Sequence, residues 1–224
     1  MAPAPRARPA RGDDFAHRQT RMVEELRRQG IEDEELLRAF QRVPRHLFVD
    51  EALTARAYRD GSLPIGHGQT ISRPLTIAHM IETLAVRPGD AVLEVGTGSG
   101  YQAALLSSLA GSVFTVERLP ALAERARVNW RRAGVTEVRM RIGDGTLGWP
   151  GAGPFTVILV SAAAPDVPRT LLSQLAIGGR MVIPVGGAFR QTLRRLVRTE
   201  IGARVEDAGE CAFVRLIGSE GFAE

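Results

Sequence analysis

The residues best suited to chemistry are three glycines and a carboxylate near the middle of the chain. Gly96, Gly98 and Gly100 follow the apolar run that ends at Val95, with the spacing G-x-G-x-G. Such a turn lets the backbone approach a ligand closely, and the helix that follows offers unpaired N–H groups. Glu117 ends the next apolar run, where a carboxylate can accept both hydroxyls of a ribose. The pattern therefore predicts a site for an adenosine-type cofactor.

A second carboxylate, Glu94, distinguishes between cofactors. Turns that bind dinucleotides prefer G-x-G-x-x-G, with the pyrophosphate at the N-terminus of the helix. Glu94 precedes Gly96 by two positions, and a negative charge there would repel a pyrophosphate but could hold an ammonium group. S-adenosylmethionine has an ammonium group and no phosphate, so we predict this cofactor, with S-adenosylhomocysteine as its product. Two alternatives stay open: Glu94 accepts N–H groups that organise the glycine loop, or the stretch is an ordinary glycine-rich turn.

The composition is that of a globular protein and excludes several kinds of site. The chain has 224 residues, of which 24% are charged, which suits one large domain. The single cysteine, Cys211, excludes an internal disulfide and favours the cytoplasm, and four scattered histidines argue against a metal site. All 29 basic residues are arginine, so lysine Schiff-base chemistry and a Walker-type phosphate loop are excluded. No apolar run approaches the roughly 18 residues of a membrane span.

Hydrophobic periodicity predicts strands that alternate with helices from residue 91 onward. The alternation indicates an α/β fold: a Rossmann-like, doubly wound, mostly parallel sheet with a C-terminal antiparallel hairpin and an N-terminal helical addition. Strands are predicted at 91–95, 112–117, 138–143, 155–161 and 180–185, and the hairpin at 191–199 and 210–217. Helices are predicted at 15–29, 33–42, 74–85, 101–110, 120–133 and 167–177.

The chain divides by composition into a tail and one domain. Residues 1–14, rich in Ala, Pro and Arg, are predicted to be a disordered tail, and 15–224 to be a single domain. Within that domain, 15–85 would hold the N-terminal helices and a long irregular loop at 45–72, and 86–224 the cofactor-binding core. Long irregular segments inside compact domains are usually functional.

Several segments together resemble the signature of the protein-L-isoaspartate O-methyltransferases. They are Pro64–Ser72, Gly96–Ala104, the Gly143-Asp144-Gly145 turn, Ala162–Ala164 and Gly178–Gly186. The resemblance covers about residues 15–217, and its most specific part is the Gln69-Thr70-Ile71-Ser72 segment. Two positions depart from the family pattern, since Thr156 replaces a usual Asp and Arg215 a usual Pro. Arg215 bears on substrate preference more than on cofactor binding.

The resemblance implies a repair enzyme, a methyltransferase that passes the methyl group of S-adenosylmethionine to the α-carboxylate of L-isoaspartyl residues in damaged peptides and proteins. Ser72 would be the catalytic residue, donating a hydrogen bond to one carboxylate oxygen; by position alone it could instead cap the helix near Pro74. Thr70 and Ile71 would form a lid over the cofactor, and Asp144 would accept from the adenine amino group. The implied cofactor site comprises Gln69, Thr70, Ile71, Glu94, Gly96, Thr97, Gly98, Ser99, Gly100, Glu117, Arg118, Asp144 and Gly145.

Alternatives to these assignments stay open at this point. Ile71 could be a core residue, and Asp144 part of an ordinary Asp-Gly turn. The chain could be a class I methyltransferase with a small-molecule or nucleic-acid acceptor, or a catalytically silent cofactor-binding protein. We expect isoaspartyl-containing peptides and proteins as partners, no nucleic acid and no membrane, because the formal net charge is only +4 and no span is present. We also expect a monomer in the cytoplasm.

Overall fold

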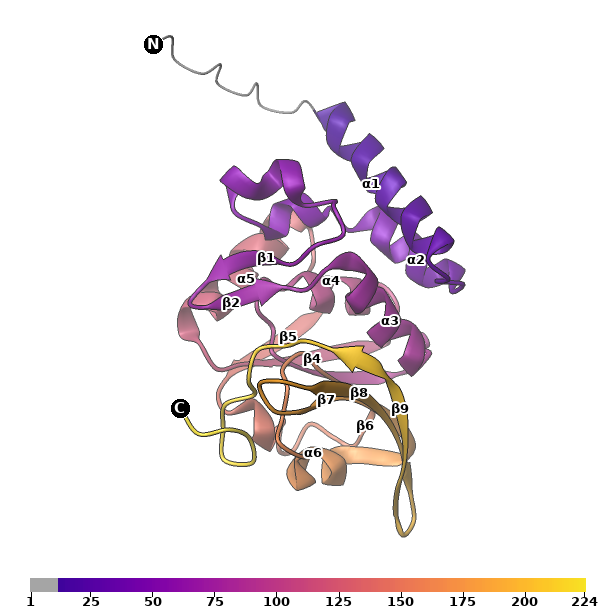
Figure 1. The fold of residues 1–224 in the computed structure, drawn as a ribbon, viewed down its shortest axis with the longest axis vertical. Helices are drawn as coiled ribbons and strands as arrows, with labels where there is room; N and C mark the ends of the chain where they lie inside the picture. Colours follow the sequence, from indigo (N-terminus) through magenta and orange to yellow (C-terminus); the bar gives the residue numbers. More distant parts are fainter. Residues whose placement is uncertain (1–11) are drawn as a thin grey trace.

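The computed structural model describes residues 12–224 (Figure 1). The sequence predicts a tail at residues 1–14. Residues 1–11 of this segment lie outside the described residues, whereas residues 12–14 belong to the first helix, α1 (Gly12–Arg28). The second helix, α2 (Glu34–Arg42), begins after Asp33, as the sequence predicts. The Asp33 carboxylate accepts a hydrogen bond from the Leu36 N–H at 3.0 Å and so caps this helix.

Seven strands form the main sheet, in the order β5-β4-β3-β6-β7-β8-β9 (Figure 1). The strands are β3 (Ala91–Val95), β4 (Ser112–Glu117), β5 (Val138–Ile142), β6 (Phe155–Val160), β7 (Leu175–Gly186), β8 (Gln191–Thr199) and β9 (Gly202–Cys211). The pairs from β5 through β7 are parallel, and β8 and β9 are antiparallel to their neighbours. The predicted fold class is therefore confirmed.

Strand order decides where a ligand can bind. Strand β3 pairs with β4 on one side and with β6 on the other, so the chain direction across the sheet reverses at β3. In open α/β sheets, ligands bind outside the carboxyl ends of the strands at such a switch point. The relevant ends are Val95, Glu117 and Val160.

Helices connect the parallel strands. They are α4 (Tyr101–Ser107), α5 (Pro120–Ala133), the short 3₁₀ segment η3 (Gly145–Leu147) and α6 (Arg169–Gln174). Helix α5 matches its prediction, and α4 is shorter than predicted. Helix α6 also ends early, because Leu175 already pairs with Phe155 as the first residue of β7.

The second strand of the C-terminal hairpin was wrongly predicted. It is β9 at Gly202–Cys211, and 212–217 belongs to none of the strands of the sheet. Strand β9 is a mostly exposed, polar edge strand, so no apolar run indicates it. The apolar run at 212–217 instead returns to the carboxyl edge of the sheet, where Ala163 N–H donates to the Val214 carbonyl at 2.8 Å and Leu216 N–H to the Ala163 carbonyl at 2.7 Å.

The N-terminal addition contains more regular structure than the loop predicted at 45–72. It holds the 3₁₀ segments η1 (Arg45–Phe48) and η2 (Glu51–Arg56), a hairpin of β1 (Leu63–Gly66) and β2 (Gln69–Ile71), and then α3 (Pro74–Leu84). The hairpin is antiparallel, and β2 leads directly toward α3.

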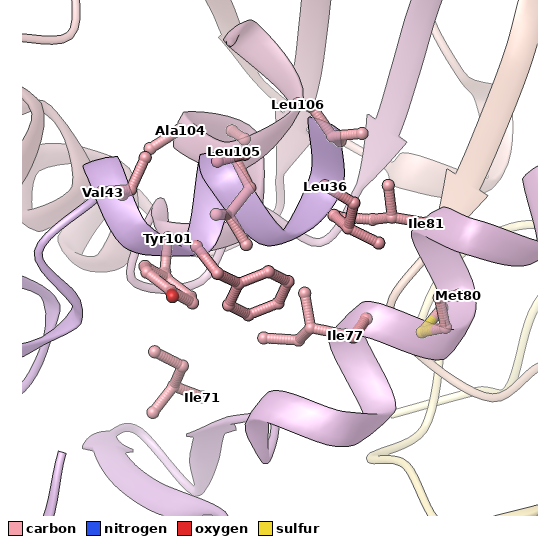
Figure 2. Close-up of a cluster of buried hydrophobic side chains, with 14 of the residues drawn as sticks. Leu36, Val43, Ile71, Ile77, Met80, Ile81, Tyr101, Ala104, Leu105 and Leu106 are labelled. Atoms are coloured by element: carbon pink, nitrogen blue, oxygen red, sulfur yellow. The ribbon is translucent and has the colours of Figure 1, made fainter. Parts of the chain in front are cut away.

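An aromatic cluster joins this addition to the core. The Tyr101 ring, at the start of α4, meets the Phe40 and Phe48 rings edge-on, with centroids 6.2 and 5.3 Å apart. Figure 2 shows the Tyr101 ring above the side chain of Ile71, within the same cluster as Ile77. Edge-to-face pairs add about 0.5–1.5 kcal/mol beyond burial. The cluster therefore fixes β2 beside the glycine turn.

Candidate active site

The glycine turn between β3 and α4 forms one wall of the site. Gly98 has φ +55° and a Cβ added there would lie 3.3 Å from Ile65 Cδ1. Gly100 has φ +85° and precedes α4, and a Cβ there would lie 2.7 Å from Trp130 Nε1. Side chains are thus excluded at both positions by conformation and by space. The side chains of Ile65 in β1 and Trp130 in α5 therefore pack close against the turn.

Glu117 stands across from this turn at the end of β4. One of its carboxylate oxygens accepts the Gly98 N–H at 2.8 Å, and the other accepts the Leu119 N–H at 2.9 Å. The residue is 6% exposed and its surface lines a pocket. A carboxylate has about four acceptor positions, so two further hydroxyl groups can bind it.

Glu94 lies below the turn and does not line the pocket. It is wholly buried; one oxygen accepts from the Thr115 hydroxyl at 2.6 Å and the other from the Gln102 amide at 3.2 Å. Burial raises the pKa of Glu94 to about 8. The expected direct contact with an ammonium group therefore does not fit its position.

The same contacts connect Glu94 to the glycine loop through side chains. The Thr115 hydroxyl is 2.6 Å from the Thr97 hydroxyl, and the Gln102 amide also donates to Ser161 Oγ at 2.7 Å. Thr97, Gln102 and Ser161 all line the pocket. Glu94 thus organises the loop, as the second interpretation proposed, but through side-chain donors instead of backbone N–H groups.

Asp144 is held by the C-terminal segment. One oxygen accepts from the Thr146 N–H at 2.8 Å and the Thr146 hydroxyl at 2.6 Å; the other accepts from the Ser219 N–H at 2.7 Å and the Ser219 hydroxyl at 2.8 Å. Partial burial raises the pKa of Asp144, but these hydrogen bonds outweigh it and the pKa lies below its usual value. Asp144 does not line the pocket, whereas Gly145 does.

The pocket itself lies at the switch point, where Val95, Glu117 and Ser161 line it, and it opens to solvent. The sequence-predicted residues that line it are Gln69, Thr70, Ile71, Ser72, Gly96, Thr97, Gly98, Ser99, Glu117, Arg118 and Gly145. Glu94, Gly100 and Asp144 stand behind the lining.

Ser72 lies between β2 and α3 and does not cap the helix. The N-cap of α3 is Arg73, whose side chain makes no capping hydrogen bond, and the Leu75 N–H of the first turn donates to the Asp60 carboxylate at 3.3 Å. Within the described residues, the Ser72 hydroxyl makes no hydrogen bond, while its carbonyl accepts from Arg45 at 2.6 Å. Ile71 is both buried and pocket-lining, so its two interpretations are compatible.

Several lining residues escaped sequence reasoning. Among the lining residues that were not predicted as site residues are Tyr101, Gln102, Ser161, Val214, Leu216 and Ile217. Arg215 also lines the pocket, at a position that the sequence analysis expected to bear on substrate preference. Ser161 follows β6 directly, so the rule that ligands bind at strand ends could have found it. For 214–217 there is no local signal, because only the return of the chain over Ala163 brings them there.

Comparison with known proteins identifies the family. A family model described as "Protein-L-isoaspartate(D-aspartate) O-methyltransferase (PCMT)" matches residues 17–221. The chain belongs to this family. The protein-L-isoaspartate O-methyltransferase of Geobacter metallireducens is 50% identical to this chain over 204 residues, which are 90% of this chain and 94% of the relative.

Two solved structures agree with this assignment. A protein-L-isoaspartate O-methyltransferase superposes with a TM-score of 0.83 and 28% identity, covering 91% of this chain and 67% of its own. A protein of Plasmodium falciparum, described as a putative protein-L-isoaspartate O-methyltransferase in complex with S-adenosyl-L-homocysteine, has a TM-score of 0.79 and 24% identity, with coverages of 89% and 98%. The latter shares the fold.

None of the helices in residues 12–224 is both long and apolar enough to cross a bilayer. No group of three or more His, Cys, Asp or Glu side chains in the same range could hold a metal ion.

Proposed function

We propose that the pocket at the switch point is the active site in which this chain carries out the reaction of its family. As a member of that family, the chain methylates the α-carboxylate of L-isoaspartyl residues in damaged peptides and proteins, with S-adenosylmethionine as methyl donor. The observation that carries the assignment is that Ser72, with a free hydroxyl, lines the same pocket as Glu117 and the glycine turn.

The residues present fit the cofactor. The Glu117 carboxylate keeps two acceptor positions for the hydroxyls of a ribose, and the glycine turn leaves room for close approach. No lysine is present in the sequence, and neither a metal nor a phosphate loop is needed. When bound, the cofactor supplies a methyl group on a sulfonium that is already an activated leaving group.

The chain's own residues then have to orient the acceptor. Carboxylates with a pKa near 4 are ionised at pH 7, so no strong general base is required. The Ser72 hydroxyl donates to one carboxylate oxygen and leaves the other directed toward the methyl group. The apolar side chains of Ile71, Ile77 and Val214 line the same space and exclude water. Catalysis comes mainly from alignment and desolvation.

The remaining assignments are also proposals. We infer that the hairpin residues Gln69, Thr70 and Ile71 cover the cofactor, and that Arg118 borders it. Asp144 could accept from the adenine amino group only by sharing its carboxylate with Ser219 and Thr146 or by giving up one of them. We infer a single domain over 15–224, a cytoplasmic monomer, and no nucleic-acid or membrane partner.

One experiment tests the function. Methyl transfer is measured on paired peptides that differ only in an Asp or an isoAsp linkage. We expect transfer to the isoaspartyl peptide alone, because a misplacement of about 1 Å can cost on the order of 10²-fold in a reaction that depends on alignment. Equal methylation of both peptides, or activity only on RNA or on a small molecule, would contradict the proposal and leave the cofactor site intact.

A further inference from the structure

A buried guanidinium lies directly behind the proposed active site. Arg45 is 0% exposed. Its Nε donates to the Ala57 carbonyl at 2.8 Å, and one terminal nitrogen donates to the Ser72 carbonyl at 2.6 Å. The other terminal nitrogen is buried and has no hydrogen-bond partner among the described residues. A buried cation is strongly destabilising unless an anion and further hydrogen bonds compensate it.

No carboxylate in the described part of the chain neutralises Arg45. The titratable side chains that act on it are Tyr101, Asp60 and Tyr58. Burial lowers the pKa of Arg45, but arginine is not deprotonated in proteins, so the positive charge persists. Among the described carboxylates that act on it there is only Asp60, which is itself paired with Arg73 at 3.6 Å.

A second unpartnered polar atom lies beside the first. The guanidinium carbon of Arg45 is 4.8 Å from the centroid of the Tyr101 ring, and the Tyr101 hydroxyl is buried without a partner. Tyr101 lines the pocket together with Ser72 and Ile71. Figure 2 shows the Tyr101 hydroxyl at the end of the ring within this cluster. The Arg45 guanidinium and the Tyr101 hydroxyl thus act on each other at the wall of the pocket that carries Ser72, and no other group among the described residues partners these two atoms.

We propose that Arg45 is the positioning residue for the methyl acceptor: it holds Ser72 by its carbonyl and supplies the positive charge that the isoaspartyl carboxylate balances on entering. The inference rests on the proposed function of Ser72. Because the guanidinium is joined to the Ser72 carbonyl, only one residue separates the cation from the hydroxyl that contacts the acceptor. Charges are weakly screened in an interior, so the cation favours an ionised acceptor over a neutral one. The second tie, to the Ala57 carbonyl, keeps the guanidinium fixed against the Ser72 carbonyl.

Three variants separate charge from tethering. Arg45→Met removes both, Arg45→Gln keeps one donor without the charge, and Arg45→Lys keeps the charge but cannot reach both carbonyls in the fork geometry of arginine. The control is Arg180→Met, because Arg180 also donates to a backbone carbonyl, that of Leu84 at 2.6 Å, but pairs with Asp90 at 2.6 Å and does not line the pocket.

The deciding measurement is the preference of the enzyme for a charged over a neutral acceptor peptide, which does not depend on folding stability. With S-adenosylhomocysteine present, binding of an isoaspartyl peptide is compared with binding of the same peptide carrying the isoasparaginyl amide, which is nearly isosteric and neutral. We expect wild type, Arg180→Met and Arg45→Lys to prefer the carboxylate, and Arg45→Met and Arg45→Gln to lose most of that preference. Affinity for S-adenosylhomocysteine alone should be unchanged in all of them.

Kinetics give an independent check. We expect Arg45→Met to lower kcat by about 10²-fold, the cost of a misplaced acceptor. The acid limb of the kcat profile, which reports groups in the enzyme–substrate complex, should move to higher pH in Arg45→Met and Arg45→Gln but not in Arg45→Lys. Arg180→Met should lower only the melting temperature.

Each outcome decides the matter. If Arg45→Met behaves like Arg180→Met, with a lower melting temperature and an intact carboxylate preference, Arg45 only ties the backbone and the proposal is overturned. If Arg45→Met does not fold, Arg45→Lys is compared with Arg45→Gln instead. If these two variants prefer the isoaspartyl peptide to the same extent, the proposal is also overturned. A wild-type enzyme that does not methylate isoaspartyl peptides would instead refute the proposed function.

Discussion

Removing the carboxylate of Glu117 should abolish most of the affinity for the cofactor. Its oxygens already accept the Gly98 and Leu119 N–H groups, at 2.8 and 2.9 Å, which leaves about two acceptor positions toward the pocket. Hydrogen bonds to a charged group contribute about 1.5–3 kcal/mol each. Discounting for water in an open pocket, we expect Glu117→Ala to lose about 2–4 kcal/mol of binding, which is about 30- to 900-fold in Kd.

Calorimetric titration with S-adenosylhomocysteine measures this loss directly. Glu117→Ala also frees two backbone N–H groups, so the variant needs a control that has the same defect elsewhere. Glu82 provides it, because one of its carboxylate oxygens accepts the Glu32 and Asp33 N–H groups at 2.7 and 2.9 Å and the residue does not line the pocket. Both variants should melt at lower temperature, and only Glu117→Ala should bind the ligand more weakly.

One result would refute the reasoning. A folded Glu117→Ala protein that binds S-adenosylhomocysteine with the wild-type Kd would show that Glu117 does not hold the ligand. Measurable binding of NAD by the wild type would contradict the choice of cofactor made from the G-x-G-x-G spacing and Glu94.

Three further predictions concern other residues of the site. Ser72→Ala should lower kcat by about 10²-fold at unchanged cofactor affinity and melting temperature, because Ser72 orients the acceptor and caps no helix; a variant that only melts earlier would contradict this. Burial raises the pKa of Glu94 to about 8, so the folded chain binds a proton there that the unfolded chain releases near pH 4.5. The contribution of this group to the free energy of unfolding therefore falls as pH rises from about 4.5 to 8. In thermal melts, the melting temperature of Glu94→Gln should rise relative to that of the wild type over this pH range. A difference in melting temperature that stays constant with pH would refute the prediction. Arg215 is exposed at the pocket, stacks on Phe222 at 5.5 Å and makes no ion pair in the described chain. Arg215→Ala should raise KM for isoaspartyl peptides with an acidic neighbour more than for neutral ones, and equal changes would contradict this.

The parts that sequence reasoning predicted well are those set by local pattern. Strands β3 and β4 and helix α5 match their predicted bounds, because their apolar periodicity is uninterrupted and their ends carry Gly96, Glu117 and Gly134. Parallel order then places the carboxyl ends of β3 and β4 at one edge, which is enough to bring the glycine turn and Glu117 together.

The parts that it missed depend on contacts between distant segments. Strand β9 lies at an exposed edge and has no apolar alternation, whereas 212–217 is apolar because it crosses the carboxyl edge beside Ala163. The same crossing brings Ser219 to Asp144, so one of the two residues that donate to that carboxylate lies 75 residues away along the chain. Nothing in the sequence near Arg45 indicates that its guanidinium lies against the Ser72 carbonyl.

The position of Glu94 outside the pocket lining has a simple physical origin, in the alternation of side chains along a strand. Leu93 and Val95 belong to one buried cluster, and Val92 belongs to the other. Glu94 shares the face of Val92, where α4 packs and Gln102 meets its carboxylate, while Val95 lines the pocket from the opposite face. Proximity in sequence to the glycine turn therefore did not give proximity to the ligand, because a period of two residues places adjacent side chains on opposite faces. Glu94 therefore contacts the pocket only indirectly, through Gln102 and Thr115. The strand face on which a side chain lies, and not its distance along the chain from the glycine turn, decides whether it can reach the pocket.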